Sequence, residues 1–299
     1  MAEFPPLRIL ASTDFSPLAG EGVAMARDLA ARFGGRVHRV HAPAPVETFL
    51  ANGAVLAPAR IQELLSQREE AIAKGLADEA ERLGLEASQV TVREGEPGAV
   101  VAAVAEEMDE DLVVVGSHGW TGLRRLLLGS VAEDILRRST VPVLVVGDHD
   151  AGSPVEPGTV VVGTDLSEQA DKATQYAARW AKACGARLRV VYVIPPGSVI
   201  GESFGGAAPG PSFATLDAER LKNAKAALDA HLAEAGLGDA DREVVLDQPW
   251  SGICGVADTV EAGLVVVGSH GRGALARALL GSVAERTSRL SERAVLIVR

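Results

Sequence analysis

Two stretches of the chain carry the same arrangement of glycine and serine residues. The first, GSHGWTGLRRLLLGSVAE, spans residues 116–133, and the second, GSHGRGALARALLGSVAE, spans residues 268–285. Thirteen of the eighteen positions are identical, among them the Gly-Ser-His-Gly start and the Gly-Ser-Val-Ala-Glu end. Repeated core packing alone would keep the apolar residues and let the glycines vary. The repeated feature is therefore a backbone geometry.

Both loops join the end of an apolar strand to the start of a helix, which is a favourable place for an anion. Glycines let the backbone turn tightly and approach a ligand closely. The first turn of the following helix presents unpaired N–H groups and the positive end of the helix dipole. The sequence therefore predicts two sites for a phosphate chain or a similar anion. The residues concerned are Gly116, Gly119, Gly129 and Ser130 in the first half and Gly268, Gly271, Gly281 and Ser282 in the second.

The elements that must position these loops follow one pattern in each half. Nearly the whole chain aligns with itself at an offset of 151 or 152 residues, and each half contains five short β-branched runs bounded by turn residues. Helical patterns separate these runs, with Ser16 and Ser167 as predicted N-cap residues. This order predicts an α/β fold with two doubly wound, five-stranded parallel-sheet domains and helices on both faces of each sheet.

Two irregular stretches interrupt the pattern. Residues 147–158, GDHDAGSPVEPG, are polar and rich in glycine and proline, which predicts a linker at 149–156 between domains at 1–148 and 157–299. Residues 195–213 follow the second strand of the second half and would overhang the carboxyl edge of its sheet. This segment is either a lid over a ligand or a disordered insertion.

Further polar and small residues fall beside the two glycine loops. Asp14 and Asp165 follow the first strand of each half, where ligands of open parallel sheets lie in the crevice at the carboxyl ends of strands. Each carboxylate could accept hydrogen bonds from ribose hydroxyls or an exocyclic amine, bind a metal, or only cap a turn. Ala42 and Val193, at the end of the second strand, could form an apolar wall for a base.

Composition narrows the classes of function. A net charge of -11 and a pI near 5.1 disfavour a nucleic-acid partner and an anionic membrane surface. No apolar run is long enough for a membrane span, and the N-terminus is not that of a signal peptide, which predicts a cytoplasmic protein. Cys184 and Cys254 have no metal-binding or redox spacing and are predicted to be reduced, small core residues.

The paired loops carry a resemblance to a known family. The sequence resembles a universal stress protein in its tandem form, and the loop pattern Gly-x2-Gly-x9-Gly-Ser of the nucleotide-binding members occurs twice. The resemblance covers essentially the whole chain. It implies a Rossmann-like fold of the adenine nucleotide alpha hydrolase type, with ATP and Mg²⁺ in each half.

The resemblance also implies a role for particular positions. Asp14 and Asp165 would lie by the nucleoside, with the backbone of Ser12 and Gly163 nearby. Ala42 and Val193 would touch adenine, and Val115 and Val267 would line the same pocket. The phosphates would meet the backbone of Gly119, Gly129, Ser130 and Val131 in the first half and of Gly271, Gly281, Ser282 and Val283 in the second.

The sequence departs from the family pattern at three places. Ala42 stands where a larger aliphatic residue is usual, Leu166 replaces the usual aromatic residue after the aspartate, and Gly263 replaces a common aspartate. None of these removes a phosphate contact. They predict unequal affinities in the two halves.

Several residues near the loops have structural interpretations as well as functional ones. Ser130 with Glu133, and Ser282 with Glu285, match a capping box that needs no ligand. His118 and His270 could be catalytic bases, but no serine, cysteine or carboxylate partner was found at a fixed offset, which favours loop structure or a polar contact to the nucleotide. Arg125 and Arg277 could reach a γ-phosphate or lie on a solvated helix face. Trp120, Trp180 and Trp250 are interpreted as packing residues.

The favoured function is a stress-response protein whose two ATP sites act as a sensor or switch. The alternative is a slow ATPase or an ATP-dependent phosphotransfer enzyme at the same site; no Walker A motif is present. The last strands, VPVLVV and AVLIV, could pair within one chain as a pseudo-twofold dimer, with a further homodimer possible and the protein partner unknown. We expect Gly129→Val and Gly281→Val each to abolish one site.

Overall fold

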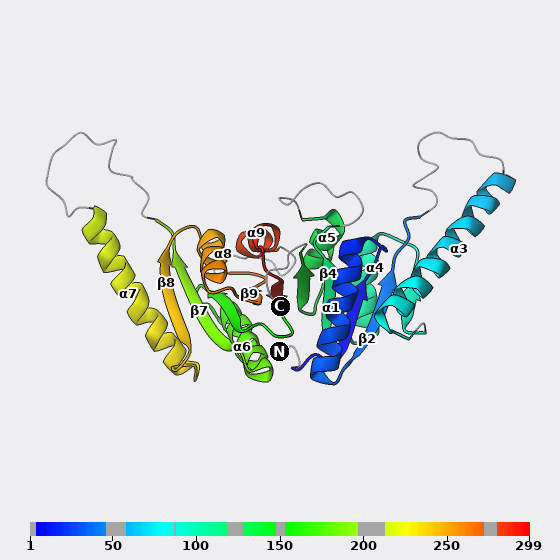
Figure 1. Ribbon diagram of the computed structural model, residues 1–299. Helices are drawn as coiled ribbons and strands as arrows, with labels where there is room; N and C mark the ends of the chain where they lie inside the picture. Colours follow the sequence, from blue (N-terminus) through cyan, green and yellow to red (C-terminus); the bar gives the residue numbers. More distant parts are fainter. Residues whose placement is uncertain are drawn as a thin grey trace, which may run out of the picture. The chain divides into compact units, whose positions relative to one another are not determined.

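The computed structural model describes residues 4–45, 58–86, 88–118, 128–147, 153–196, 213–271 and 280–299. The chain divides into two compact units, Met1–Asp148 and His149–Arg299. Each unit alternates strands and helices, as the sequence predicts (Figure 1). No helix in the described part of the chain is both long and apolar enough to span a membrane.

The described elements of the first unit are five strands and four helices. In chain order they are β1 (Arg8–Ser12), α1 (Pro17–Phe33), β2 (Arg36–His41), α3 (Pro58–Leu83), β3 (Val90–Val92), α4 (Pro97–Glu107), β4 (Leu112–Gly116), α5 (Ser130–Arg138) and β5 (Val143–Val146).

The second unit repeats this order within the described residues. Its elements are β6 (Thr159–Thr164), α6 (Glu168–Cys184), β7 (Arg187–Ile194), α7 (Phe213–Glu234), β8 (Asp241–Leu246), α8 (Pro249–Thr259), β9 (Leu264–Gly268), α9 (Ser282–Leu290) and β10 (Val295–Val298).

The strands of each unit are parallel, and the first strand lies in the middle. In the first unit the order is β3-β2-β1-β4-β5, and in the second it is β8-β7-β6-β9-β10. Because β1 pairs with both β2 and β4, the winding of the chain changes direction there. Ligands of open α/β sheets bind at the carboxyl ends of the strands beside such a switch point.

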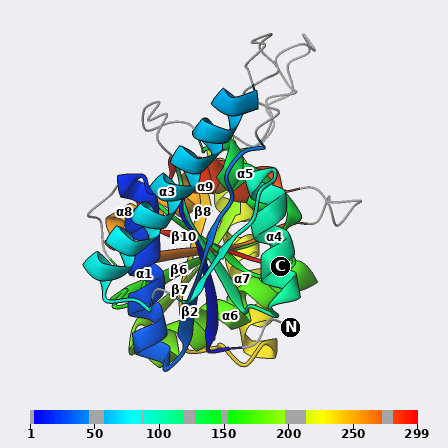
Figure 2. The same cartoon turned by 90° about the vertical axis from the view of Figure 1, so that its right-hand side faces the viewer.

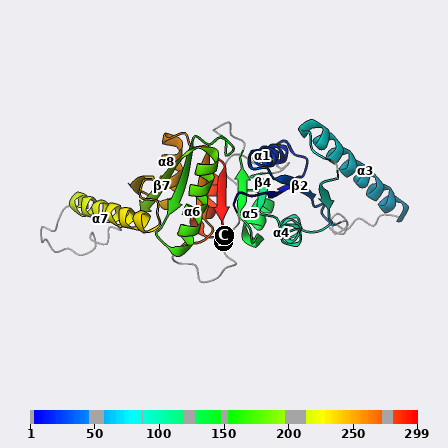
Figure 3. The same ribbon diagram turned by 90° about the horizontal axis from the view of Figure 1, so that it is seen from below.

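Helices cover both faces of each sheet, so the central strands are buried on both sides. In the first unit α1 and α3 lie on one side of the strands, and α4 and α5 lie on the other (Figures 2 and 3). All five residues of β4 are buried, as are Ile9, Leu10 and Ala11 in β1. These runs of buried valine, leucine and isoleucine are typical of a parallel sheet between two helical layers.

The first helix of each unit begins and ends as the sequence predicts. The Ser16 hydroxyl accepts a hydrogen bond from the Ala19 amide, and the Ser167 hydroxyl accepts one from Ala170. Gly34 and Gly185 end the two helices in the left-handed region, with φ of 73° and 67°. The N-cap serines place the turn that precedes each helix at the carboxyl end of the central strand.

Two of the predicted packing residues can be placed. Trp180 is fully buried, and its indole N–H donates to the Pro154 carbonyl at 2.9 Å, while Trp250 is only half-buried. Trp120 lies outside the described residues. Cys184 on α6 and Cys254 on α8 form no disulfide in the described part of the chain, and both are half-buried rather than part of the core.

Candidate functional site

Each unit has a cavity at the carboxyl ends of its central strands. The cavity of the first unit has a volume of about 340 Å³ and that of the second about 510 Å³, within the range of roughly 300–1,000 Å³ that is usual for ligand pockets. The lining brings together almost all of the site residues predicted from the sequence. In the first unit these are Ser12, Asp14, Ala42, Val115, Gly116, Gly129, Ser130 and Val131. In the second they are Gly163, Asp165, Val193, Val267, Gly268, Gly271, Gly281, Ser282 and Val283.

A turn after the first strand of each unit presents the predicted aspartate. The Asp14 Oδ1 atom accepts the Ser16 amide at 2.9 Å, and the Asp165 Oδ1 atom accepts the Ser167 amide at 3.1 Å. The turn-capping role that the sequence left open is therefore present in both units. Each aspartate also lines the cavity of its own unit.

The residue after each aspartate has a strained backbone. Phe15 and Leu166 have φ of 63° and 59°, in the left-handed region that bulky side chains rarely adopt. A threonine hydroxyl stabilises each: Thr13 Oγ1 accepts the Phe15 amide at 3.1 Å, and Thr164 Oγ1 accepts the Leu166 amide at 3.0 Å. Strain of this kind is concentrated at ligand sites, where surrounding contacts hold it in place.

The predicted anion loops end at helix starts, but the predicted capping boxes are wrong. The N-cap residues of α5 and α9 are Gly129 and Gly281, so Ser130 and Ser282 are the first helical residues and make no cap hydrogen bond. Glu133 instead pairs with Arg137 one turn along α5, at 2.6 Å. With no side-chain cap on the glycine N-caps, the first N–H groups of both helices face the cavity that Gly129, Ser130, Gly281 and Ser282 line.

Contacts within the protein also explain why the loop positions are glycines. A Cβ on Gly116 would lie 3.2 Å from the Leu18 carbonyl oxygen, so this glycine lets α1 pack against the end of β4. A Cβ on Gly271 would lie 2.8 Å from Asp165 Oδ2. The second glycine of the loop and the aspartate that follows the first strand therefore lie close together in the second unit.

The two loop histidines have a serine partner that the sequence interpretation missed. The Ser117 hydroxyl lies 2.8 Å from His118 Nδ1, and the Ser269 hydroxyl lies 2.8 Å from His270 Nδ1. The sequence prediction that these histidines lack a recurring serine partner is wrong, because the serine that immediately precedes each histidine contacts its ring. Both histidines line their cavities, with the ring orientation set by the serine.

Several cavity residues were not predicted from the sequence. Thr13, His41, Pro97 and Val101 line the first cavity, and Thr164, Pro249 and Ile253 line the second. The repeated Thr-Asp pair could have indicated Thr13 and Thr164. Pro97 and Val101 lie on α4, and only the folded sheet brings that helix to the edge beside β2.

Other predicted positions cannot be compared with the structure. Gly119, Arg125 and Arg277 lie outside the described residues, as do residues 197–212 of the predicted lid or insertion and residues 149–152 of the predicted linker. Among the described residues, no group of three or more histidine, cysteine, aspartate or glutamate side chains could hold a metal ion.

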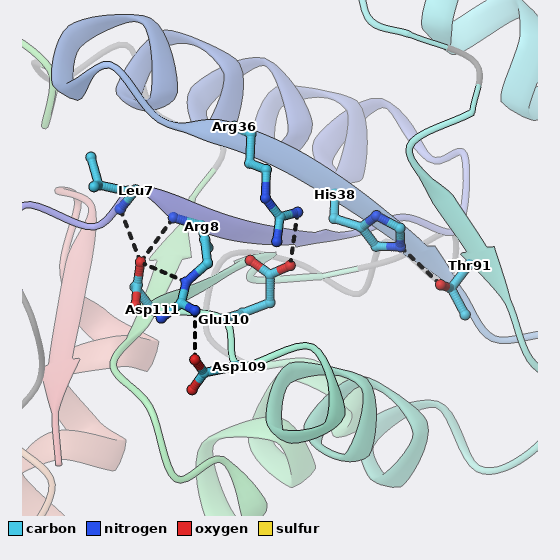
Figure 4. Close-up of polar contacts among 8 residues, drawn as sticks. All are labelled: Leu7, Arg8, Arg36, His38, Thr91, Asp109, Glu110 and Asp111. Atoms are coloured by element: carbon cyan, nitrogen blue, oxygen red, sulfur yellow. Dashed lines mark hydrogen bonds and ion pairs between the residues drawn. The ribbon is translucent and has the colours of Figure 1, made fainter.

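Two buried carboxylates with shifted pKa values, Glu110 and Asp111, lie at the amino ends of strands of the first sheet (Figure 4). Burial raises the pKa of Glu110, whose nearest cation is Arg36 Nη1 at 3.4 Å. Burial would also raise the pKa of Asp111, but hydrogen bonds from the Arg8 side chain and from the Arg8 and Leu7 amides lower it below the usual value. These groups lie at the amino ends of β1, β2 and β4, so they belong to the stability of the fold and not to the cavity.

The comparison with family models covers both units. The model of the universal stress protein family matches residues 7–147 and again residues 157–299. The chain belongs to the universal stress protein family. Its two units are tandem universal stress protein domains, as the sequence resemblance predicted.

Individual relatives agree with this assignment. Universal stress protein Rv2005c of Mycobacterium tuberculosis is 33% identical over 192 residues, which are 64% of this chain and 62% of the relative. The match therefore spans slightly less than two thirds of the relative's length. The crystal structure of a universal stress protein from Archaeoglobus fulgidus has a TM-score of 0.65 at 21% identity, with 98% of this chain and 96% of that chain covered, and shows the same fold. A solved universal stress protein in complex with cAMP is 30% identical, with 48% of this chain and 98% of that chain covered and a TM-score of 0.33.

Proposed function

We propose that this universal stress protein binds ATP in each domain and acts as a nucleotide-dependent sensor or switch in a stress response. One observation carries the proposal: in each domain one cavity is lined by an aspartate turn, an apolar residue at the end of the second strand and a Gly-Ser helix start. These groups are suited to a ribose, a base and a phosphate chain, respectively, and the aspartate turn follows the central strand, as the ribose that joins the base to the phosphates requires.

The cavities fit this ligand by the chemistry of their walls. Asp14 and Asp165 would accept from the nucleoside, beside the backbone of Ser12 and Gly163. Ala42 and Val115 in one domain, and Val193 and Val267 in the other, would contact adenine. The main chain from Gly129 to Val131 and from Gly281 to Val283 would hold the phosphates, with Gly119 and Gly271 beside them. The amides of Gly129 and Gly281 donate to the Ser117 and Ser269 carbonyls, so the donors would be the amides of the two residues that follow each glycine. Magnesium would enter with ATP.

A substitution that removes a single main-chain donor gives the sharpest test. Proline is well tolerated at the first position of a helix and lacks the N–H group. Gly129 and Gly281 have ψ of 145° and 144°, which a residue before proline readily adopts. Ser130→Pro and Ser282→Pro should therefore keep the fold and each weaken one site by about tenfold or more, since a hydrogen bond to a charged group is worth roughly 1.5–3 kcal/mol.

Isothermal titration with Mg-ATP measures the outcome. We expect two sites in the parent protein and one strong site in each proline variant, with Ser130→Ala and Ser282→Ala as controls that keep the amide. Gly129→Val and Gly281→Val should also abolish one site each, but an added Cβ there approaches the Ser117 or Ser269 carbonyl oxygen to 3.2 or 3.0 Å and strains the loop itself. Two unaltered sites in a Ser130→Pro/Ser282→Pro double variant would show that the phosphates lie elsewhere.

A second candidate function, slow ATP hydrolysis, is favoured by the Ser117–His118 and Ser269–His270 pairs. A histidine whose ring is fixed by a neighbour and lines the cavity could position a water or a phosphate oxygen. A steady-state assay with Mg-ATP separates the two functions: turnover near or above about 1 s⁻¹, which is ordinary for enzymes, would identify an ATPase.

A further inference from the structure

A chain of buried side chains ties the aspartate turn of the first domain to α3. The Thr13 hydroxyl donates to Glu79 Oε1 at 2.8 Å, and Glu79 Oε2 lies 3.4 Å from Arg39 Nη1. Thr13, Glu79 and Arg39 are only 5%, 5% and 1% exposed. At this depth an unpaired charge is costly, so the ion pair and the hydrogen bond from Thr13 depend on each other.

The network is anchored on the last turns of α3 and on the segment that follows. Arg39 donates to the Leu76 carbonyl at 3.0 Å and to the Glu86 carbonyl at 3.4 Å. The guanidinium therefore has a fixed position between β2 and α3. Glu79, one turn further along α3 than Leu76, is held by it and faces Thr13.

This network fixes the turn that presents Asp14. A hydroxyl has one hydrogen to donate, and that of Thr13 is used for Glu79, so its lone pairs point toward the Phe15 amide that it accepts. The Phe15 ring lies against α3 as well, where a Cβ on Gly75 would come within 3.1 Å of it. Helix α3 thus holds the strained turn at two points.

The same positions in the second domain hold different residues. Gly84 and Gly236 follow α3 and α7 with the same pattern of backbone hydrogen bonds, which aligns Glu79 with His231. The strand registers align Arg39 with Val190. His231 Nε2 lies 2.6 Å from Asp171 Oδ1 and so points to α6 rather than to the turn.

Thr164 nevertheless repeats the local part of the turn. It accepts the Leu166 amide at 3.0 Å, as Thr13 accepts Phe15. In the described part of the chain its hydroxyl donates to no carboxylate. The two turns therefore share their local hydrogen bonds and differ in the buried connection to the helix.

We infer that Glu79 and Arg39 are positioning residues of the first site, which hold the Asp14 turn in its binding conformation before a ligand enters, and that the second site lacks this device. The inference rests on the proposed function only for the identity of the ligand. A turn that is already held in its binding conformation loses less conformational entropy when the ligand binds. We therefore expect the first site to bind more tightly than the second.

The first test uses the ligand-free protein. Hydrogen–deuterium exchange measures the exchange rates of the Phe15 and Ser16 amides and compares them with those of Leu166 and Ser167, the matching amides of the second turn. We expect slower exchange in the first turn, by about fivefold to tenfold, the effect of one net hydrogen bond on an opening equilibrium. In a double variant, Thr13→Val with Thr164→Val, both turns lose the same local acceptor and the first also loses its link to Glu79, so this difference should disappear. Thr13→Ser, which keeps the hydroxyl, should retain the slower exchange of the parent protein.

Affinity gives the second test. With the other site weakened by Ser282→Pro or Ser130→Pro, titration with Mg-ATP should show that Thr13→Val weakens the first site more than its matched control Thr164→Val weakens the second, by about fivefold. Glu79→Gln, which keeps an acceptor for Thr13 but removes the charge opposite Arg39, should give an intermediate loss. Circular dichroism and thermal unfolding confirm that each variant is folded.

The two measurements separate two kinds of failure. Equal exchange in the two turns of the parent protein, or equal effects of Thr13→Val and Thr164→Val, would overturn the positioning role. The expected difference in exchange together with no binding of Mg-ATP would instead overturn the proposed ligand and leave the positioning role standing.

Discussion

Adjacent carboxylates can act in opposite directions on stability, and Glu110 and Asp111 show why. The Glu110 carboxylate is fully buried, and neither oxygen accepts a well-aligned hydrogen bond from the described residues, although Arg36 Nη1 lies 3.4 Å from Oε1. Asp111 is also buried but accepts two backbone amides and the Arg8 guanidinium. Burial therefore raises the pKa of Glu110, whereas the hydrogen bonds at Asp111 outweigh burial and lower its pKa.

This contrast predicts opposite effects for two neighbouring substitutions. A carboxyl group with a raised pKa in the folded state binds its proton more tightly there, so its contribution to stability falls as pH rises above the unfolded pKa. Glu110→Gln should therefore raise the free energy of unfolding at pH 7, and the gain should shrink as pH is lowered toward 4. Urea unfolding at several pH values measures this.

Asp111→Asn is the matched control for Glu110→Gln. The pKa of the Asp111 carboxyl is lowered in the folded protein, so the ionised carboxylate stabilises the fold at pH values above its unfolded pKa. This contribution is lost on acidification. The substitution should cost about 1–3 kcal/mol at neutral pH, because it disturbs hydrogen bonds to a charged group. Destabilisation by Glu110→Gln at pH 7 would mean that the Arg36 pair outweighs the cost of burial.

At the scale of the elements, glycine has two separable roles. Gly185 ends α6 with φ of 67°, and a Cβ there would meet nothing within 4 Å, so its only requirement is backbone conformation. Gly255 lies inside α8, and a Cβ there would also meet nothing within 4 Å. The same substitution should therefore have opposite effects at two positions of one domain.

We expect Gly185→Ala to destabilise the second domain by about 1–2 kcal/mol, the cost of the left-handed conformation for a residue with a Cβ. Gly255→Ala should stabilise it by about 0.5–1 kcal/mol, because alanine loses less backbone entropy in a helix. Thermal unfolding of the two variants beside the parent protein checks both values. Equal signs would contradict the assignment of one glycine to a cap and the other to a helix interior.

At the scale of the whole molecule, two domains with their own cavities should respond to ligand separately. A ligand that binds only the folded state at 100 times its dissociation constant stabilises it by about 2.7 kcal/mol. In calorimetric scans with and without Mg-ATP at this concentration, Ser282→Pro should leave the stabilisation of the first domain and reduce that of the second to about 1.4 kcal/mol or less, since its site is weakened about tenfold or more. Ser130→Pro should do the reverse, and the double variant should show both stabilisations reduced.

Loss of both shifts in either single variant would indicate one site that needs both loops. The domain boundaries at 148 and 157, the pseudo-twofold pairing of the two last strands and the cytoplasmic location stay predictions. Size-exclusion chromatography with light scattering measures whether further homodimers form.

The sequence by itself determined the two-fold repetition, the parallel α/β architecture and most of the cavity walls. These follow from local signals: runs of valine predict buried strands, cap residues such as Ser16 predict helix starts, and repeated glycines predict loops with special backbone geometry. Such signals depend on neighbours along the chain. Each signal predicts structure more firmly here because it occurs in both halves of the same sequence.

Only the tertiary structure decided which groups meet across the chain. It showed that Gly129 rather than Ser130 caps α5, that a serine orients each loop histidine, and that Glu79, 66 residues away from Thr13, holds the aspartate turn. The physical reason is that the partner of a buried polar group is set by packing between elements. Glu79 is an ordinary residue of an amphipathic helix until β1, β2 and α3 come together around it.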